Sequence, residues 1–315
     1  MLQRLTPMAG QFSFPQANSV VFHGRHVQFP DPNDPSVSHS DGADTGYALS
    51  DQLISTGSLS AKITFQEVSD KTQAGIILWS EPSNGACIAA VISRTPWLGP
   101  LFVIRNWDGK TWTDFPGGSG DGSILRQGHQ YDLHVHVEGS TALMIVDGVQ
   151  VVKTNIFAGL RKSSPGLYCF SRNDIEIVDF EVKPELPKAF VVMQFTQPFN
   201  ELWRSVVEPV CRSKGIDAKR ADDDYGPGMI ISDVVARIRE SALIIAEITP
   251  ANANVYYEVG YAHALGKPTI LIAERGTKLP FDISGFRVLM YENSIDGKAK
   301  FEEGLIKHLD AVFAQ

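Results

Sequence analysis

A glutamate that follows a predicted strand is the residue best placed to do chemistry in this chain of 315 residues. Glu258 lies in the segment 252–267, between two short apolar runs at 242–249 and 268–274. Apolar runs on either side of a helical segment are typical of buried parallel strands joined by a crossover helix. The loop before Glu258 then opens at the carboxyl edge of a sheet, where α/β folds bind their ligands.

The position of Glu258 in the first turns of its predicted helix bears on its charge. The positive end of a helix favours a nearby carboxylate, so we expect Glu258 to be ionised at neutral pH. An ionised carboxylate beside an open crevice acts as a nucleophile or stabilises a developing cation. The alternative is a solvated side chain, which is common for acids near helix starts.

Predicted strands and helices alternate after residue 188. This alternation predicts an α/β domain over 188–315, with a parallel sheet of five strands in the flavodoxin-like order 2-1-3-4-5. The predicted strands are 189–195, 216–222, 242–249, 268–274 and 287–291, and the predicted helices are 201–213, 229–241, the segment that holds Glu258, and 298–313. In this arrangement the loops at the carboxyl ends of the strands face one crevice.

Those loops carry amides, acids and aromatic rings that suit a sugar and a stacked base. The candidate substrate-binding residues are Phe195, Thr196, Phe199, Asp222, Asn252, Asn254, Phe281 and Asp282. The phenylalanines either stack on a base or pack in the core. Asn254 shares a helix face with Glu258, so it either bonds a ribose hydroxyl or serves as the helix N-cap. Asp222 contacts the substrate or belongs to a solvated acidic turn, and Asp282 is a substrate ligand or a loop cap.

The first strand is not followed by a phosphate-binding fingerprint. Neither G-x-G-x-x-G nor a Walker lysine is present, which disfavours a Rossmann dehydrogenase and a P-loop NTPase. No serine occupies a nucleophile elbow.

The first half of the chain, residues 1–184, predicts an antiparallel sandwich or jelly roll. Short alternating runs are separated by Gly, Asp, Asn and Ser, and no helical period interrupts them. Asp147-Gly148 is a two-residue hairpin signal. The clearest predicted strands are 58–65, 74–79, 86–92, 100–105, 131–137, 142–146, 149–152 and 175–182.

Three tryptophans in this half, Trp97, Trp107 and Trp112, could form a sugar platform. We favour the alternative that they cap the sandwich core, because aromatic side chains supply large buried area wherever they lie. His134 and His136 share a strand face but have no third metal ligand in sight, so we expect ordinary sheet surface there.

No metal site or bound cofactor is predicted elsewhere. The acids of the loop 31–44, which are Asp31, Asp34, Asp41 and Asp44, match no calcium-loop pattern, so we expect a solvated loop. The cysteines Cys87, Cys169 and Cys211 lack metal spacing and are typical of small buried side chains in a reducing compartment.

Composition limits the classes of partner. A net charge of −8 gives no electrostatic footprint for duplex nucleic acid. The N-terminus lacks the apolar segment of a signal peptide, and no apolar run is long enough to cross a bilayer. We therefore expect a soluble cytoplasmic protein without a membrane partner.

Five blocks of the second half resemble the nucleoside 2-deoxyribosyltransferase and TIR-like nucleotide-binding superfamily. They are 190–195, 220–222, 245–249, 252–264 and 280–282. The resemblance implies cleavage of the N-glycosidic bond of a nucleoside, a nucleotide or NAD, and it places the catalytic glutamate at Glu258. Two positions depart from the family pattern, since Glu247 stands where an Asp is usual and Gln194 where a Pro is frequent.

The first half resembles the concanavalin-like (laminin-G-type) jelly roll. The resemblance rests on the segments 75–79, 131–133, 146–149 and 166–168. It implies a fold and carries no catalytic signature.

Together these resemblances imply a TIR-like N-glycosidase, with NAD or a related nucleotide as its substrate, in a bacterial stress or antiphage pathway. The sandwich would be a sensor or an assembly module, which binds a glycan, a protein or a second copy in a homo-oligomer. Two alternatives stay open: a nucleotide sensor without turnover, and a nucleoside deoxyribosyltransferase.

Overall fold

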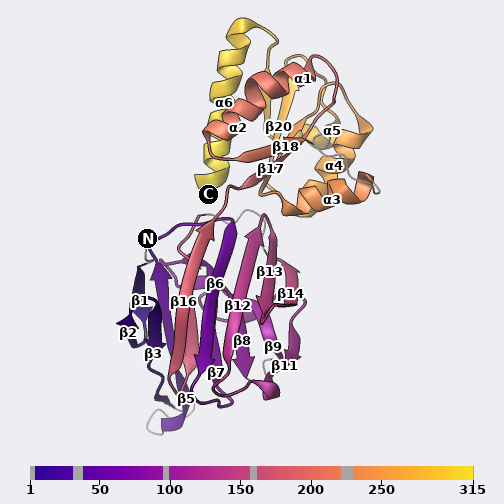
Figure 1. Ribbon diagram of the computed structural model, residues 1–315. Helices are drawn as coiled ribbons and strands as arrows, with labels where there is room; N and C mark the ends of the chain where they lie inside the picture. Colours follow the sequence, from indigo (N-terminus) through magenta and orange to yellow (C-terminus); the bar gives the residue numbers. More distant parts are fainter. Residues whose placement is uncertain (1–3, 31–37, 95–98, 157–161, 221–229, 315) are drawn as a thin grey trace. The chain divides into compact units, whose positions relative to one another are not determined.

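The computed structural model describes residues 4–30, 38–94, 99–156, 162–220 and 230–314 (Figure 1). The chain divides into two compact units, with the main division between Glu185 and Leu186. We call them the sandwich unit and the α/β unit.

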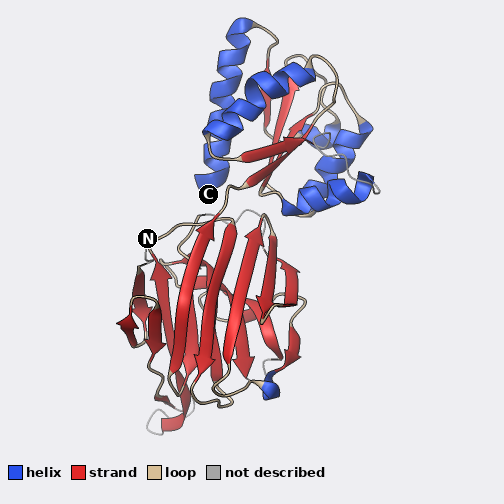
Figure 2. Ribbon diagram, viewed as in Figure 1, coloured by secondary structure: helices blue, strands red, loops and turns tan. Residues whose placement is uncertain are grey.

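The sandwich unit is built almost entirely from strands (Figure 2). One sheet of nine strands has the order β1-β5-β15-β7-β8-β9-β10, with β4 beside β5 and β11 beside β9. The other, of seven strands, has the order β14-β13-β12-β6-β16-β3-β2. The strands are β1 (Leu5–Ala9), β2 (Phe12–Gln16), β3 (Ser19–Phe22), β4 (His26–Pro30), β5 (Ser38–Ser50), β6 (Gly57–Phe65), β7 (Thr72–Glu81), β8 (Ala86–Arg94), β9 (Pro100–Trp107), β10 (Trp112–Asp114), β11 (Ser119–Asp121), β12 (Gln130–Glu138), β13 (Thr141–Val146), β14 (Val149–Asn155), β15 (Gly166–Ser171) and β16 (Ile175–Pro184).

The two sheets differ in how they meet water. In β6 of the seven-stranded sheet, buried and half-exposed residues alternate along the whole strand, as expected when one face is packed and the other is wet. In β8 of the nine-stranded sheet, residues of both faces are buried. The predicted two-residue hairpin is observed, since Asp147 and Gly148 have φ angles of 50° and 78°, the left-handed values of a type I′ turn.

The strand β5 is a correction to the predicted loop 31–44. Residues 38–50 form one long strand, in which Asp44 accepts a hydrogen bond from Arg25 at 2.7 Å. The sequence concealed this strand because Gly, Asp and Ser have low strand propensity. Asp31 and Asp34 lie outside the described residues. Within the described part of the chain, no group of three or more His, Cys, Asp or Glu side chains is arranged to hold a metal.

The α/β unit is a parallel sheet of five strands in the order β18-β17-β19-β20-β21. In chain order this is 2-1-3-4-5, so the predicted topology is confirmed. The strands are β17 (Lys188–Val192), β18 (Asp217–Arg220), β19 (Leu243–Glu247), β20 (Thr269–Glu274) and β21 (Val288–Tyr291). The helices are α1 (Phe199–Leu202), α2 (Glu208–Ser213), α3 (Ile230–Glu240), α4 (Ala253–Ala264), α5 (Phe281–Ser284) and α6 (Ile295–Ala314).

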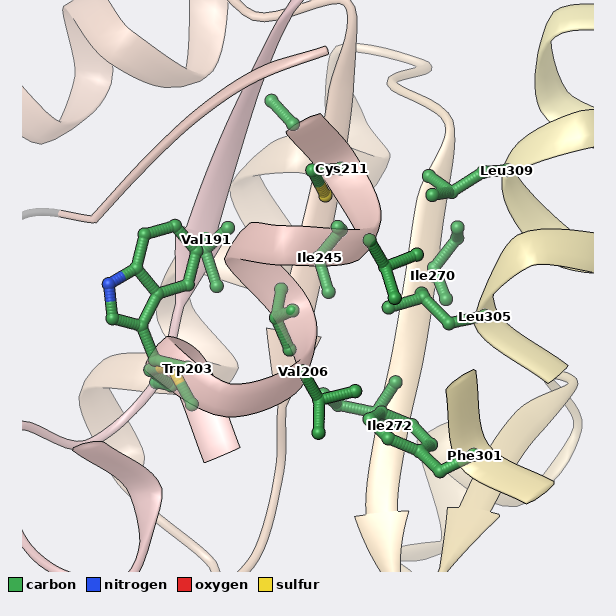
Figure 3. Packing of buried hydrophobic residues seen from close by; sticks show 14 of the residues in the cluster. Val191, Trp203, Val206, Cys211, Ile245, Ile270, Ile272, Phe301, Leu305 and Leu309 are labelled. Carbon is green, nitrogen blue, oxygen red and sulfur yellow. The ribbon is translucent and has the colours of Figure 1, made fainter. Parts of the chain in front are cut away.

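Helices cover both faces of this sheet (Figure 2). Successive residues of β17 point to opposite faces, so Val191 joins one core and Phe190 joins the other. The core that contains Val191 also holds Trp203, Leu305 and Leu309, which come from helical segments on that side (Figure 3). The second core contains side chains of α3 and α4.

The predicted helix 201–213 is interrupted. It begins two residues earlier, and a π-helical turn, Trp203–Val207, separates α1 from α2. Pro209 has no backbone N–H, so it cannot donate to the preceding turn, and a local change of hydrogen bonding accommodates it. Among the helices that the structure describes, none is long and apolar enough to cross a membrane.

Candidate functional site

Glu258 lies in the second turn of α4, the helix that follows β19. This helix packs across β17, β19 and β20. Because β17, β19 and β20 are neighbours in the sheet, their carboxyl-end loops also lie next to one another. Phe195 and Thr196 follow β17, the segment 252–258 follows β19, and Phe281 with Asp282 follows β20. The structure therefore brings most of the predicted site residues to one edge of the sheet.

The carboxyl group of Glu258 is half-buried, and burial raises its pKa from 4.5 to about 7. It makes no hydrogen bond or ion pair with any residue that the structure describes. Five residues separate it from the start of α4, which is roughly 7 Å along the axis, and the favourable field of a helix end falls off within the first turn. Desolvation outweighs that field, so the helix terminus does not hold the pKa of Glu258 at or below its usual value, and the carboxyl group is only partly ionised at neutral pH.

The N-cap of α4 is Asn252. Its Oδ1 accepts a hydrogen bond from the backbone N–H of Asn254 at 2.9 Å, and its own backbone is extended. The alternative in which Asn254 caps the helix is therefore incorrect. Asn254 is exposed, one helical turn before Glu258, and its side chain is free of partners among the described residues. Asn252 has one side-chain oxygen committed to the helix.

The loop after β17 is tied to the end of β18 by an arginine. The guanidinium of Arg220 is buried and donates to Oδ1 of Asn200 at 2.9 Å, while the side-chain amide of Asn200 donates to the Phe195 carbonyl at 3.2 Å. The guanidinium carbon lies 5.2 Å from the centre of the Phe195 ring. Phe195 nevertheless remains 47% exposed. This cluster holds an aromatic ring at the edge of the sheet.

The remaining candidates have different surroundings. Thr196 is exposed, whereas Phe199 is buried in the core, so it follows the packing alternative. Phe281 is 91% exposed at the start of α5. Asp282 is exposed and does not cap α5, whose N-cap is Pro280. Asp222 lies outside the described residues.

Glu247, at the end of β19, is a buried structural carboxylate. Its oxygens accept from the backbone N–H of Thr249 at 3.0 and 3.1 Å, and Oε1 accepts from the hydroxyl of Tyr291 at 3.1 Å. Burial raises the pKa of Glu247 to about 7. Tyr291 was not predicted from the sequence, because nothing local links it to a residue 44 positions away.

A cavity of about 450 Å³ opens beside the carboxyl ends of β20 and β21. The charged side chains of its lining are Glu201, Glu274, Glu292 and Lys298, and Ser205, Asn293 and Ser294 add further polar groups. Glu258 is absent from the described lining. Glu258 is thus a half-buried carboxylate without a partner among the described residues, and the acidic cavity is formed by other residues.

Trp107 and Trp112 of the sandwich unit do not cap the core between its sheets. Trp107 and Trp112 pack against a cluster whose buried members come only from strands of the nine-stranded sheet, so this cluster lies on the sheet face turned away from the other sheet. Both rings line a cavity there. Both rings are half-buried, so the packing alternative is confirmed in part for Trp107 and Trp112, although the cluster that they cover lies on the outer face of the sheet. Trp97 lies outside the described residues.

No family model and no curated protein matches this chain. Among solved structures, it is similar to the carbohydrate-binding module CBM66 from Bacillus subtilis, with 12% identity over 56% of this chain and 92% of that one and a TM-score of 0.42. It is similar to a galectin-like protein from Bacillus subtilis, with 10% identity, 57% and 88% coverage and a TM-score of 0.39. A CMP N-glycosidase from Clostridium botulinum has 19% identity over 39% of this chain and 98% of that one, with a TM-score of 0.30. Likenesses at these TM-scores carry no conclusion about activity.

Proposed function

We propose that the α/β unit is an N-glycosidase that cleaves the bond between ribose and base in NAD or a related nucleotide. The observation that carries the proposal is the carboxyl group of Glu258, which is half-buried, has a pKa of about 7 and has no partner among the described residues. Ionising a half-buried carboxyl group that has no partner destabilises the folded protein. Groups with such perturbed pKa values cluster at functional sites. The resemblance of the segment 252–264 to the superfamily's glutamate block supports the same residue.

The chemistry follows from the charge that bond cleavage creates. When the C1′–N bond breaks, its electron pair leaves with the base and positive charge develops on the ribose ring. The ionised carboxylate of Glu258 stabilises that charge or forms an ester with C1′. Water then adds to C1′ and releases a proton, and the products are the free base and the ribosyl compound.

The other groups at this edge divide into those open to a substrate and those committed to the fold. Phe195 and Phe281 are exposed aromatic rings that suit stacking on a base, and Asn254 and Thr196 are exposed polar side chains that suit ribose hydroxyls. Asp282 is also exposed. By contrast, Asn252 caps α4 and the side chain of Phe199 packs in the core, so we assign neither residue a primary role in binding the substrate.

The test is release of nicotinamide from NAD by the full chain, and release of base from a panel of nucleotides. E258Q keeps the shape of the side chain and removes its charge, and we expect it to lower turnover by at least about 10²-fold. E303Q changes an exposed glutamate of α6 and should leave turnover unchanged. Equal turnover by the wild type and E258Q would overturn the assignment of Glu258.

A nucleotide sensor without turnover is the second candidate. The separation of Glu258 from the described lining of the 450 Å³ cavity favours it, because a nucleotide bound in that cavity would not need the glutamate. Saturable nucleotide binding without base release, unaffected by E258Q, would support the sensor. Exchange of an added free base into the product would instead support deoxyribosyl transfer.

For the sandwich unit we propose a role in sensing or in self-assembly, with bacterial stress or antiphage defence as the setting. Assembly is tested by the mass of the full chain in solution and by activity as a function of concentration. A protein that stays monomeric and has the same specific activity at every concentration would remove the assembly proposal.

A further inference from the structure

A serine, a histidine and an aspartate of the sandwich unit form a hydrogen-bonded chain, and the proposed N-glycosidase activity uses none of them. Oγ of Ser13 lies 2.7 Å from Nε2 of His23, and Nδ1 of His23 lies 3.0 Å from Oδ2 of Asp174. These are the contacts that join a nucleophile to its base and the base to the carboxylate that orients it. The aspartate is 151 positions from the histidine in the sequence, so no local pattern predicts the chain.

Three neighbouring strands of the seven-stranded sheet, β16, β3 and β2, bring these residues together. Ile175 of β16 pairs with Phe22 of β3, so Asp174 and His23, one step further along the two strands, also lie opposite each other. Ser13 of β2 lies diagonally across from His23. Phe22 and Ile175 are fully buried, and side chains alternate along a strand, so the three polar residues lie on the face turned to water.

The main chain holds the histidine and the aspartate side by side. The backbone N–H of His23 donates to the Gln11 carbonyl at 2.9 Å, which fixes the end of β3 against the segment before β2. A Cβ added at Gly24 would lie 2.4 Å from the carbonyl oxygen of Asn173, so only glycine lets this segment approach the turn that carries Asp174. The chain of side chains is therefore formed before any substrate arrives.

The aspartate determines which ring nitrogen of His23 carries the proton. A carboxylate accepts hydrogen bonds and cannot donate them, so Nδ1, which faces Asp174, holds the hydrogen. Nε2 then has a free lone pair, and the hydroxyl of Ser13 donates to it. The imidazole is thereby placed as a base for this hydroxyl, and the carboxylate stabilises the imidazolium that forms when the proton is taken.

A second serine of the same sheet also touches a histidine but has its proton directed elsewhere. The hydroxyl of Ser58 lies 3.0 Å from Nδ1 of His136, and it donates to Oε1 of Glu185 at 3.2 Å. A hydroxyl has one proton, so here the proton faces a carboxylate and the imidazole donates to the oxygen. The contact between Ser58 and His136 therefore does not activate the hydroxyl, and Ser58 is a matched control for Ser13.

We propose that Ser13, His23 and Asp174 form an acyl-transfer site that hydrolyses small carboxylic esters. Oγ of Ser13 bonds to the carbonyl carbon of the ester while its proton passes to Nε2 of His23. The bond from that carbon to the alcohol oxygen breaks, and the alcohol leaves with the proton. Water then adds to the acyl carbon and gives a proton to Nε2, the bond to Oγ breaks, and Oγ takes the proton back as the acid is released.

The openness of the site sets its range of substrates and its rate. The side chains of His23 and Asp174 are 42% and 47% exposed, so a small ester reaches the hydroxyl directly from solvent. Water also reaches the site, and it weakens the electrostatic stabilisation that a closed site would give to the transition state. We therefore expect turnover well below that of enzymes with an enclosed site, with most of the gain coming from the histidine base.

Labelling of the full chain with a fluorophosphonate tests the nucleophile, because a serine activated by an imidazole displaces fluoride and forms a P–O bond. We expect mass spectrometry to find the label on Ser13, and p-nitrophenyl acetate to acetylate the same residue. H23Q should slow both reactions by about 10²-fold or more, because it removes the base. S58A and E258Q should leave both unchanged, so this activity and the proposed N-glycosidase activity succeed or fail separately.

Asp174 acts through the histidine, so its test reads the ring itself. Nitrogen NMR of the His23 ring should show the proton on Nδ1 in the wild type, and D174A should lose this preference together with the labelling of Ser13. Near-ultraviolet circular dichroism checks that each variant is folded, and the wild-type label and ring spectrum need no variant. No label on any serine, labelling of Ser58 as fast as Ser13, labelling of H23Q at the wild-type rate, or a wild-type ring protonated at Nε2 would overturn the proposal.

Discussion

Replacing Glu258 by glutamine should make the protein more stable at alkaline pH. The carboxyl pKa of Glu258 rises from 4.5 to about 7 through burial, so the folded state holds this proton more tightly than the unfolded state does. Its contribution to the free energy of unfolding is therefore greatest at low pH and is lost as pH rises from about 4.5 to about 7. Glutamine carries no charge, so the stability of E258Q does not fall with pH through this position.

The magnitude follows from the pKa difference. A shift of about 2.5 pKa units corresponds to about 3 kcal/mol. Because part of the side chain meets solvent, screening reduces this to about 1–2 kcal/mol. We expect E258Q to exceed the wild type by that amount at pH 8, and by about a quarter of it at pH 5, where the folded wild type is still protonated.

Urea unfolding followed by ellipticity at 222 nm measures this difference. The signal follows the α/β unit, because the one helical segment described in the sandwich unit is the short turn Gly122–Ile124. The two units need not unfold together, so a helix-specific signal is preferable to tryptophan fluorescence. Equal midpoints for E258Q and the wild type at pH 8, with unchanged slope, would refute the reasoning.

The control variant for this experiment is E303Q, because the pKa of Glu303 is shifted in the opposite direction from that of Glu258. Glu303 is exposed, and the hydrogen bond from Lys307 lowers its pKa. A carboxyl group with a lowered folded pKa contributes stability above its unfolded pKa, and this is lost as pH falls. E303Q should therefore show no gain at pH 8.

Three further predictions concern the framework around the site, and urea unfolding checks each. N252A removes the N-cap of α4 and should cost about 1 kcal/mol, whereas N254A should stay within about 0.5 kcal/mol; similar losses would contradict the assigned cap. Y291F removes a donor from the buried carboxylate at the end of β19 and should cost about 1–2 kcal/mol, more at pH 8 than at pH 6, because the lost bond favours the ionised form. L305A should lower the free energy of unfolding by about 2–5 kcal/mol because Leu305 is fully buried. I295A in the same helix should change it by less than about 0.5 kcal/mol because Ile295 is 97% exposed. Equal effects of the two substitutions would contradict the burial pattern of α6.

Local patterns were sufficient to predict the α/β sheet. The apolar run 242–249 becomes β19, whose residues are all buried, and the alternation of strands with helices limits the topology to few choices. The long strand Ser38–Ser50 was missed because its Gly, Asp and Ser residues resemble a loop, and only pairing with its neighbours makes it a strand.

The site was harder to predict because its decisive properties are not local. The helical position of Glu258 follows from spacing, but its pKa depends on how much solvent the folded chain excludes. The bond between Glu247 and Tyr291 joins ends of two strands that are not neighbours in the sheet. Likewise, Trp112 lines a cavity because it meets Tyr168, which is distant in sequence.

The three cysteines offer a practical opportunity for labelling. All three are buried, and burial raises the pKa of Cys87 and Cys211 to about 12 and that of Cys169 further still. Thiols in this state are poor nucleophiles toward maleimide reagents. A single cysteine introduced by F281C, at a position that is 91% exposed, would therefore accept a fluorescent dye without first removing the native thiols. The dye would report on its surroundings at the carboxyl edge of the α/β sheet, in place of a ring that is proposed to stack on the base.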